Sequence, residues 1–248
     1  MVYRILSFGA GVNSVALLTL YDYDKIVFCD TGAEMPYTYG YIHFLEKLGY
    51  KIDIVKPTLK RKVGNKILHF NSLYEYCYVT GLVPNFSNRF CTSDWKIQPF
   101  YKYIKKILLR NRANGIKTEI HIAYTVDEKS RVYNSKRLKN YYETKYNVKY
   151  VYPLVEKGIR RIDCIKLILY KFCKIPRKSS CFFCPFGGVN KIITLYYEYP
   201  NLLQKVIELE NRISEIRGKE YRIFGFDINK LIEKLKDQRR LDLYYQQF

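Results

Sequence analysis

The chain has 248 residues, of which 48% are hydrophobic, so it has enough apolar side chains for one sizeable packed domain and a small appendage. That composition excludes a disordered chain, and the length excludes two domains of ordinary size. Lys and Arg number 43 against 23 Asp and Glu, and the net charge of +20 favours polyanions, nucleic acid above all, as partners. A Lys-rich surface that only reflects biased composition is the alternative, because the chain also holds 26 Tyr.

The sequence pattern also bears on where the protein works. Its apolar runs are shorter than a membrane span needs, and Met1 to Leu6 has the pattern of a strand rather than of a signal peptide. Seven cysteines in a chain of this length do not indicate a secreted disulfide scaffold. We therefore expect a cytoplasmic protein without a membrane partner, whose cysteines are reduced and in part metal ligands.

The first elements alternate between strand and helix. Short apolar runs rich in β-branched and aromatic residues predict strands, and Pro36 and Gly49 mark the start and the stop of a helix. In chain order we expect a strand at 2–8, a helix at 13–20, a strand at 25–29, a helix at 36–48 and a strand at 51–55. This order predicts an open, mainly parallel sheet with helices on both faces.

The later elements complete that sheet and add helices to it. Aromatic and turn residues over 63–88 predict an insertion over the sheet. We then expect an amphipathic helix at 95–112, strands at 119–125 and 149–152, and helices at 160–173, 191–197, 201–217 and 228–245. The prediction is a five-stranded α/β nucleotide-binding domain over 1–156, with a helical, cysteine-containing C-terminal region over 157–248 packed on it.

A glycine loop, Ser7-Phe8-Gly9-Ala10-Gly11-Val12-Asn13-Ser14, joins the first strand to the first helix. Glycines let the backbone approach a phosphate, and the helix N-terminus offers free N–H groups and the positive end of its dipole. The loop lacks the Gly-Lys-Ser/Thr ending of a Walker A motif and the third glycine of the Rossmann fingerprint. It resembles the PP-loop, Ser-Gly-Gly-x-Asp-Ser, with Gly9, Ala10 and Asn13 in place of a Ser, a Gly and the Asp. A tight turn without a ligand is the alternative.

Further segments resemble, in the same order, the motifs of the phosphoadenosine phosphosulfate reductase-like family of the PP-loop ATP pyrophosphatase superfamily. They are Asp30-Thr31-Gly32, the run from Arg89 to Lys96, and the segment with Glu128 and Arg131. The resemblance implies an adenine nucleotide alpha-hydrolase-like fold that binds ATP, or a related adenine nucleotide, with Mg²⁺. We expect the nucleotide at Ser7, Gly9, Ala10, Gly11, Val12, Asn13, Ser14, Asp30, Thr31, Arg89 and Glu128, and catalysis from Asn13, Ser14, Lys96 and Arg131. For Asp30, a turn residue that caps a helix is the alternative.

Cys181-x-x-Cys184 has the spacing of a metal-ligand pair, and it lies in the run that matches the family best. A pair needs further ligands, and we predict Cys91 and Cys164 because both lie inside family-like segments, with Cys173 as a substitute. Pro185 favours an iron–sulfur cluster over zinc, and Arg177 and Lys178 are expected to lower the pKa of the thiols. A redox pair and two free buried thiols are the alternatives, and we interpret Cys29 and Cys77 as apolar core residues.

The resemblance implies cleavage of ATP between its α and β phosphates, adenylation of an acceptor oxygen and release of pyrophosphate, after which sulfur or nitrogen displaces AMP. The reductase branch needs a C-terminal Glu-Cys-Gly-x-His segment, and no cysteine follows Cys184. We therefore predict an ATP-dependent transferase that thiolates nucleic acid, with tRNA or DNA as acceptor and a sulfur donor protein as partner. A sulfonucleotide reductase and a non-catalytic nucleotide-binding module are the alternatives.

Overall fold

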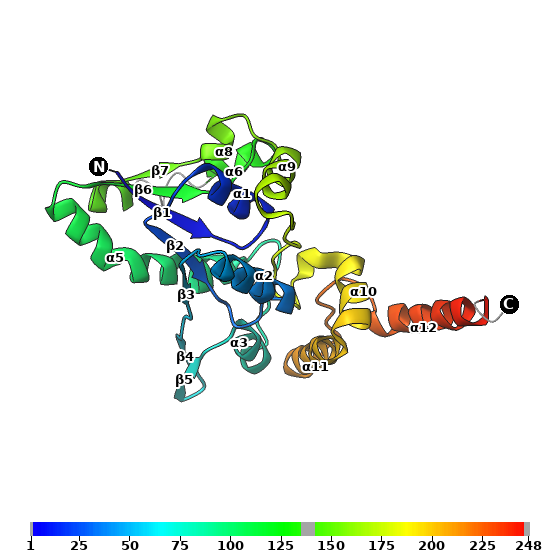
Figure 1. Ribbon diagram of the computed structural model, residues 1–248. Coiled ribbons are helices and arrows are strands. Elements are labelled where there is room, and N and C mark those ends of the chain that lie inside the picture. Colours follow the sequence, from blue (N-terminus) through cyan, green and yellow to red (C-terminus); the bar gives the residue numbers. More distant parts are fainter. Residues whose placement is uncertain (1, 135–141, 246–248) are drawn as a thin grey trace.

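The computed structural model describes the backbone of residues 2–134 and 142–245, and its side chains over 2–132 and 142–237 (Figure 1). Its centre is a sheet of five parallel strands in the order β3-β2-β1-β6-β7. The strand order reverses at β1, because the chain leaves β3 at one edge and returns beside β1 as β6. In open α/β sheets, ligands bind beyond the carboxyl ends of the strands at such a reversal. The strands are β1 (Val2–Phe8), β2 (Lys25–Cys29), β3 (Ile52–Val55), β6 (Lys117–Ile122) and β7 (Val148–Val151).

Helices cover both faces of the sheet, as its buried strands require. Neighbouring residues of a strand point to opposite faces, so Ile5 and Leu6 belong to two different hydrophobic clusters. On the Leu6 face pack α1 (Val12–Leu20), α2 (Pro36–Lys47) and α9 (Arg161–Phe172); on the Ile5 face packs α5 (Gln98–Ala113).

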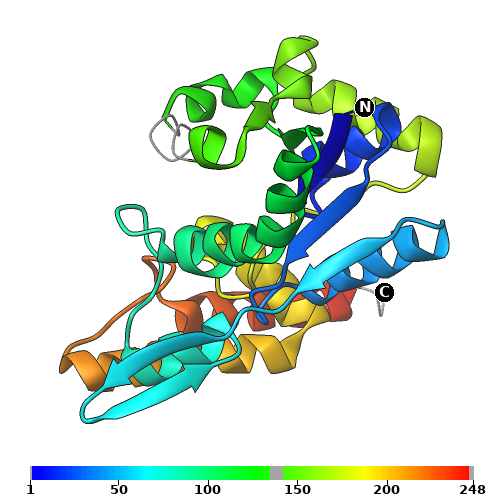
Figure 2. The ribbon, with the colours of Figure 1, turned by 90° about the vertical axis from the view of Figure 1, so that its left-hand side faces the viewer.

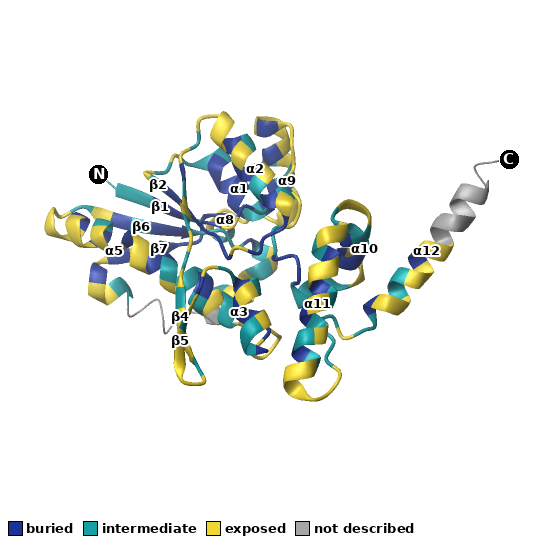
Figure 3. Cartoon of the chain, turned by 90° about the horizontal axis from the view of Figure 1, so that it is seen from below, coloured by how far each residue is buried: buried dark blue, intermediate teal, exposed yellow. Residues whose placement is uncertain are grey.

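A third hydrophobic cluster, here called the helical core, lies beside the sheet and surrounds the fully buried Trp95. Trp95 lies on a single π-helical turn, Ser93–Ile97, which leads directly into α5. Figure 3 shows α10 and α11 set apart from the sheet, with α12 leading away from them. The helices that contribute to the helical core are α3 (Leu73–Thr80), α10 (Gly188–Glu198), α11 (Pro200–Arg217) and the start of α12 (Ile228–Tyr245).

A two-stranded antiparallel ribbon, β4 (Leu59–Val63) and β5 (Lys66–Phe70), projects from the body of the molecule (Figure 2). Single turns complete the chain: α4 (Phe90–Thr92), α6 (Lys129–Asn134), α8 (Pro153–Glu156) and the 3-10 turns Val126–Glu128 and Pro185–Gly187. Within the described ranges, every helix is too short or too polar to cross a bilayer.

The predicted α/β class and the five-stranded parallel sheet are confirmed, and each predicted strand overlaps an observed one. Two features differ from the prediction. The ribbon β4–β5 and α3 occupy the stretch that we expected to be an irregular insertion. In addition, α9 packs on α1 in the core of the sheet, although we placed it in the C-terminal region. Apolar side chains on one face of α9, among them Cys164 and Ile168, explain that packing.

Candidate functional site

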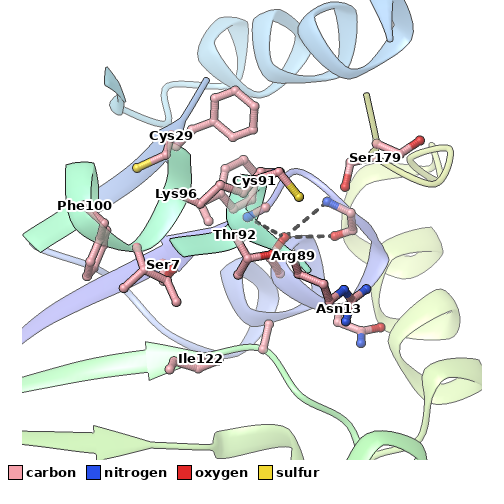
Figure 4. Close-up of a pocket in the computed structure, with 18 of the residues that line it drawn as sticks. Ser7, Asn13, Cys29, Arg89, Cys91, Thr92, Lys96, Phe100, Ile122 and Ser179 are labelled. Carbon is pink, nitrogen blue, oxygen red and sulfur yellow. Dashed lines mark hydrogen bonds between the residues drawn. The ribbon is translucent and has the colours of Figure 1, made fainter. Parts of the chain in front are cut away.

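A cavity of about 700 Å³ opens at the carboxyl ends of the strands, where the strand order reverses. Figure 4 shows side chains from the glycine loop, from the segment before α5 and from the segment before the cysteine pair around this space. Thirteen predicted site residues line it: Ser7, Gly9, Gly11, Val12, Asn13, Ser14, Arg89, Cys91, Lys96, Glu128, Arg131, Cys181 and Cys184. The cavity lining does not include the other four, Ala10, Asp30, Thr31 and Cys164.

The glycine loop is held in place by its own serine. The Ser14 hydroxyl accepts hydrogen bonds from the N–H groups of Gly9 (3.3 Å) and Gly11 (3.2 Å), and donates one to the carbonyl of Gly11 (3.1 Å). Ala10 adopts a left-handed conformation, φ 53°, at a position where the PP-loop has glycine. The loop therefore turns sharply into α1, whose first N–H groups have no partner within the helix.

Asn13 joins three segments that are far apart in the sequence. Its side-chain amide donates to Glu128 Oε2 (2.8 Å), and its side-chain oxygen accepts from Arg161 (3.3 Å). Glu128 also forms an ion pair with Arg131, whose guanidinium lies over the ring of Tyr124. The structure thus brings together the predicted residues of the glycine loop and of the segment after β6. Arg161, which also lines the cavity, was not among the predicted site residues.

Positive charge collects on the side of the cavity that faces the glycine loop. Arg89 and Lys178 line the cavity, and no ion pair is recorded for either within the described part of the chain. The Arg89 guanidinium lies over the ring of Phe186, at 4.6 Å from its centroid, and exposed Phe86 meets that ring edge-on. Free guanidinium and ammonium groups beside a helix N-terminus can neutralise the phosphates of a nucleotide.

Lys96 has a different environment from the one we predicted. Its ammonium forms an ion pair with the buried carboxylate of Glu34 at 3.0 Å, so a protein group already balances its charge. Thr31 links this pair to the thiols, because its hydroxyl donates to Glu34 Oε1 (3.3 Å) and lies 3.3 Å from Cys181 Sγ. Lys96 and Thr31 therefore belong to the thiol side of the site rather than to the phosphate side.

Asp30 does not reach the cavity. Its side chain is buried and accepts hydrogen bonds from the Gly32 N–H (2.8 Å) and from the Tyr39 hydroxyl (2.7 Å). These two bonds hold the turn after β2, where Gly32 adopts φ 66°. Asp30 is therefore a turn residue outside the cavity lining, as in the alternative that we named, but it caps no helix, because the N-cap of α2 is Met35.

Backbone pairing places the cysteine pair at the end of β2. The Met35 N–H donates to the Ser180 carbonyl (3.0 Å) and the Phe182 N–H to the Ala33 carbonyl (2.9 Å). The segment before the pair also passes close to the glycine loop, since a Cβ on Gly11 would lie 3.1 Å from Ser179 Oγ. The glycine loop and the cysteine pair therefore line the same cavity.

Four cysteines belong to the helical core: Cys77 and Cys181 are buried in it, and Cys91 and Cys184 pack against it. Burial raises the pKa of the Cys77 thiol, and the charges of Cys181 and Cys91 raise it further. Cys164 lies elsewhere, buried between α9 and α1 on the sheet. The predicted ligand Cys164 therefore lies apart from the cysteine pair, and Cys77 is a buried core residue, as we interpreted it.

The thiols of the pair are not activated in the way that we expected. Burial raises the pKa of Cys181 and of Cys184. Arg177, which we expected to lower these values, is bound to Glu198 and lies over Tyr37 instead. The nearby cation is Lys191, a nearly buried lysine that the sequence did not signal; its ammonium donates to Ser180 Oγ (2.7 Å) and its charge lowers the pKa of Cys184.

As they stand, no three Cys, His, Asp or Glu side chains among the described residues are arranged to chelate an ion. Two of the four cysteines of the helical core, Cys77 and Cys181, are buried, and the carboxylate near them, Glu34, is paired with Lys96. Cys29 also lines the cavity, at the end of β2, with a thiol pKa that burial raises to about 12.

Comparison with known proteins adds one distant relative. No protein-family model and no solved structure matches the chain. An uncharacterised protein of Methanocaldococcus jannaschii is 24% identical over 239 residues, which cover 91% of this chain and 49% of that protein. The chain thus spans about half the length of the curated relative that it matches.

Proposed function

We propose that the chain is a PP-loop ATP pyrophosphatase-type enzyme of the phosphoadenosine phosphosulfate reductase-like family, and that it activates an acceptor for sulfur transfer. The observation that carries the proposal is the shared cavity, in which a glycine loop at a helix N-terminus faces a cysteine pair. Phosphate-binding backbone and soft sulfur ligands have separate uses, and a single enzyme needs both when it joins nucleotide chemistry to sulfur chemistry.

The nucleotide occupies the glycine-loop side of the cavity. The N-terminus of α1 receives the phosphates, and Arg89, Arg161 and Lys178 neutralise their charge. Glu128 holds Asn13 and Arg131 in position, and its carboxylate is available to Mg²⁺ when the nucleotide is bound. Catalysis of this kind depends on positioning and on charge neutralisation.

The thiol side holds a metal ion or an iron–sulfur cluster. Its ligands are Cys77, Cys91, Cys181 and Cys184, and a set of four thiolates fits either zinc or a cluster. A bound cluster supplies a site at which sulfur can be held; zinc supplies a structural clamp. Lys191 and Lys96 offset part of the negative charge that four thiolates bring.

The reaction has two steps. An acceptor oxygen attacks the α phosphorus of ATP, the bond to the β-phosphate oxygen breaks, and pyrophosphate leaves. A sulfur nucleophile from a donor protein then displaces AMP, which departs with the acceptor oxygen. Nucleic acid is the acceptor class that the net charge of +20 favours.

The test follows AMP from ATP labelled at the α phosphorus and pyrophosphate from ATP labelled at the γ phosphorus, with Mg²⁺ and sulfide as the sulfur nucleophile, in the presence of tRNA or DNA. We expect equal amounts of AMP and pyrophosphate. Arg161→Met, which removes a cation of the cavity, should lower kcat/KM by about a hundredfold, the usual loss for one charge-stabilising group. Arg160→Met is the matched control, because Arg160 is exposed, lies next in sequence and is not part of the cavity lining.

Other outcomes decide among the alternatives. ATP binding without any AMP would identify a nucleotide-binding module, for which Asn13 in place of the Asp of the PP-loop is the favouring observation. Sulfite release from phosphoadenosine phosphosulfate with a thiol donor would identify a sulfonucleotide reductase. An Arg161→Met variant as active as wild type would contradict the placement of the nucleotide.

A further inference from the structure

The ribbon β4–β5 has two chemically different faces. Residues directly opposite each other in an antiparallel pair share a face, and the pairs alternate between the two faces. Leu59 with Phe70, and Arg61 with Leu68, form the inner face, which packs toward the helical core. The pairs Lys60 with His69 and Lys62 with Ile67 form the outer face, and all four of these residues are exposed.

The outer face is basic and carries no balancing charge. Its lysines are Lys60 and Lys62, and the sequence from Lys56 to Phe70 has no Asp or Glu. No ion pair to Lys60 or Lys62 is recorded within the described part of the chain. Ile67 is 68% exposed between these charges. A partner that is anionic and also has a small apolar surface would balance the charge of the lysines and cover Ile67.

The base of the ribbon is fixed at the rim of the cavity. Thr58 and Asn71 close it with a side-chain hydrogen bond of 2.9 Å. Immediately afterwards the Leu73 N–H donates to the Thr31 carbonyl at 2.8 Å, and the Leu73 side chain lines the cavity. On the inner face, Arg61 is bonded to the Tyr76 hydroxyl of α3. The ribbon is therefore an arm with a fixed root beside the cavity.

We propose that the outer face of the β4–β5 ribbon binds duplex DNA in the major groove. A two-stranded ribbon fits the major groove of B-DNA, which is about 12 Å wide, whereas the major groove of A-form RNA is too narrow and deep. Lys60 and Lys62 contact phosphates, and Ile67 packs on the groove floor, where thymine presents a methyl group. The binding of DNA by the ribbon does not depend on the proposed function. The further idea, that the ribbon brings an acceptor to the cavity, rests on the proposed function.

The experiment measures the affinity of the whole chain for a short labelled DNA duplex over a series of salt concentrations, without ATP. Lys60→Ala/Lys62→Ala should weaken binding about tenfold and lower the slope of log Kd against log salt by about 2, one for each lost phosphate contact. The matched control is Lys47→Ala/Lys51→Ala, which removes the same charge. Those two exposed lysines precede β3 at the opposite end of the sheet, and we expect less than about a twofold effect there.

Each result decides the matter. A loss in Lys60→Ala/Lys62→Ala alone supports the arm. Equal losses in both double variants would contradict the proposal, because the DNA would then be attracted only by the net charge of the protein. Tighter binding of duplex RNA than of duplex DNA, lost in Lys60→Ala/Lys62→Ala, would show that the ligand of the ribbon is RNA and would also contradict the proposal. If the wild-type protein binds DNA through the ribbon but forms no pyrophosphate, the proposed function is contradicted and the proposal on DNA binding is supported. If it forms pyrophosphate but binds no DNA, the proposal on DNA binding is contradicted and the proposed function is supported.

Discussion

The parallel sheet and the helical core differ in how they hold the side chains that meet at the cavity. On the sheet, Asn13 and Glu128 follow neighbouring strands and are joined by hydrogen bonds between charged or polar groups at the surface. In the helical core, Cys77 and Cys181 are buried, and Cys91 and Cys184 are half-buried at the wall of the cavity. The sheet thus presents hydrogen-bonding groups to the cavity, whereas the helical core presents apolar surroundings in which burial raises the pKa of Cys181 and Cys184.

The largest effect should come from the metal content of matched cysteine variants. Cys77 and Cys164 are both completely buried, so alanine at either position removes a similar apolar contact. If the four thiols of the helical core hold the metal, Cys77→Ala should lose most of the metal or iron and sulfide per chain, and Cys164→Ala should keep it. The metal, iron and sulfide content of each variant is measured after purification without oxygen. Equal metal content in Cys77→Ala and Cys164→Ala would contradict the assignment of the metal to the helical core.

The Glu34–Lys96 pair joins the two regions, and breaking it should cost stability. Lys96→Met leaves the buried carboxylate of Glu34 without its cation, and we expect a loss of about 2 kcal/mol in the free energy of unfolding, a reduced value because Lys96 is partly exposed. Glu34→Gln/Lys96→Met should regain most of it. Urea unfolding measures both variants. If Lys96→Met left stability unchanged and lowered ATP affinity about tenfold, Lys96 would contact the phosphates of ATP, and the account of the ion pair would be wrong.

A pH dependence of stability between pH 4.5 and about 7 should arise in the helical core. Burial raises the pKa of Glu210 on α11 to about 7, from an ordinary 4.5, although the Ile223 N–H donates to its carboxylate. The folded state therefore keeps a proton that the unfolded state releases, so stability is fully present below pH 4.5 and falls as the pH rises to about 7. After discounting for partial exposure, we expect about 1 kcal/mol of dependence. Glu210→Gln should flatten the profile, and a profile unchanged by that substitution would contradict this.

The smallest effect concerns the glycine loop. Ala10 is held at φ 53°, where an L-residue is strained and glycine is not. Ala10→Gly should raise the free energy of unfolding by about 0.5 kcal/mol, because relief of strain outweighs the lost entropy advantage of alanine. Ala16→Gly, inside α1, should instead lower it by about 1 kcal/mol. Thermal unfolding distinguishes the two signs; a loss in both variants would mean that the loop is not strained.

The same contrast between the sheet and the helical core explains which parts of the site could be predicted from the sequence. Strand-end motifs of a parallel sheet converge by topology, so residues such as Asn13, Glu128 and Arg131 could be placed together from their order alone. Asp30 stands at a strand end as well, but whether its carboxylate turns toward a ligand or back to Gly32 depends on a two-residue turn. Local hydrogen bonding decides that, and no periodic pattern reveals it.

The thiol set could not be predicted for a related reason. Cys164 lies in a helix whose apolar face pairs with α1, whereas Cys77 lies in a helix within a stretch that shows no clear strand or helix period. Which buried helix faces which core depends on tertiary packing over more than a hundred residues, such as the contact of α3 with α11. The ribbon escaped prediction because Arg61 on its inner face and Ile67 on its outer face break the alternation of a strand.

The most direct test of a cavity shared by nucleotide and thiols is the rate at which individual cysteines react with an alkylating reagent, followed by mass spectrometry on chelator-treated protein. Cys91 lines the cavity, and exposed Cys173 lies beyond α9 and serves as the internal control. We predict that ATP with Mg²⁺ slows the alkylation of Cys91 and leaves that of Cys173 unchanged. Alkylation of Cys91 at the same rate when ATP is bound would contradict a shared site.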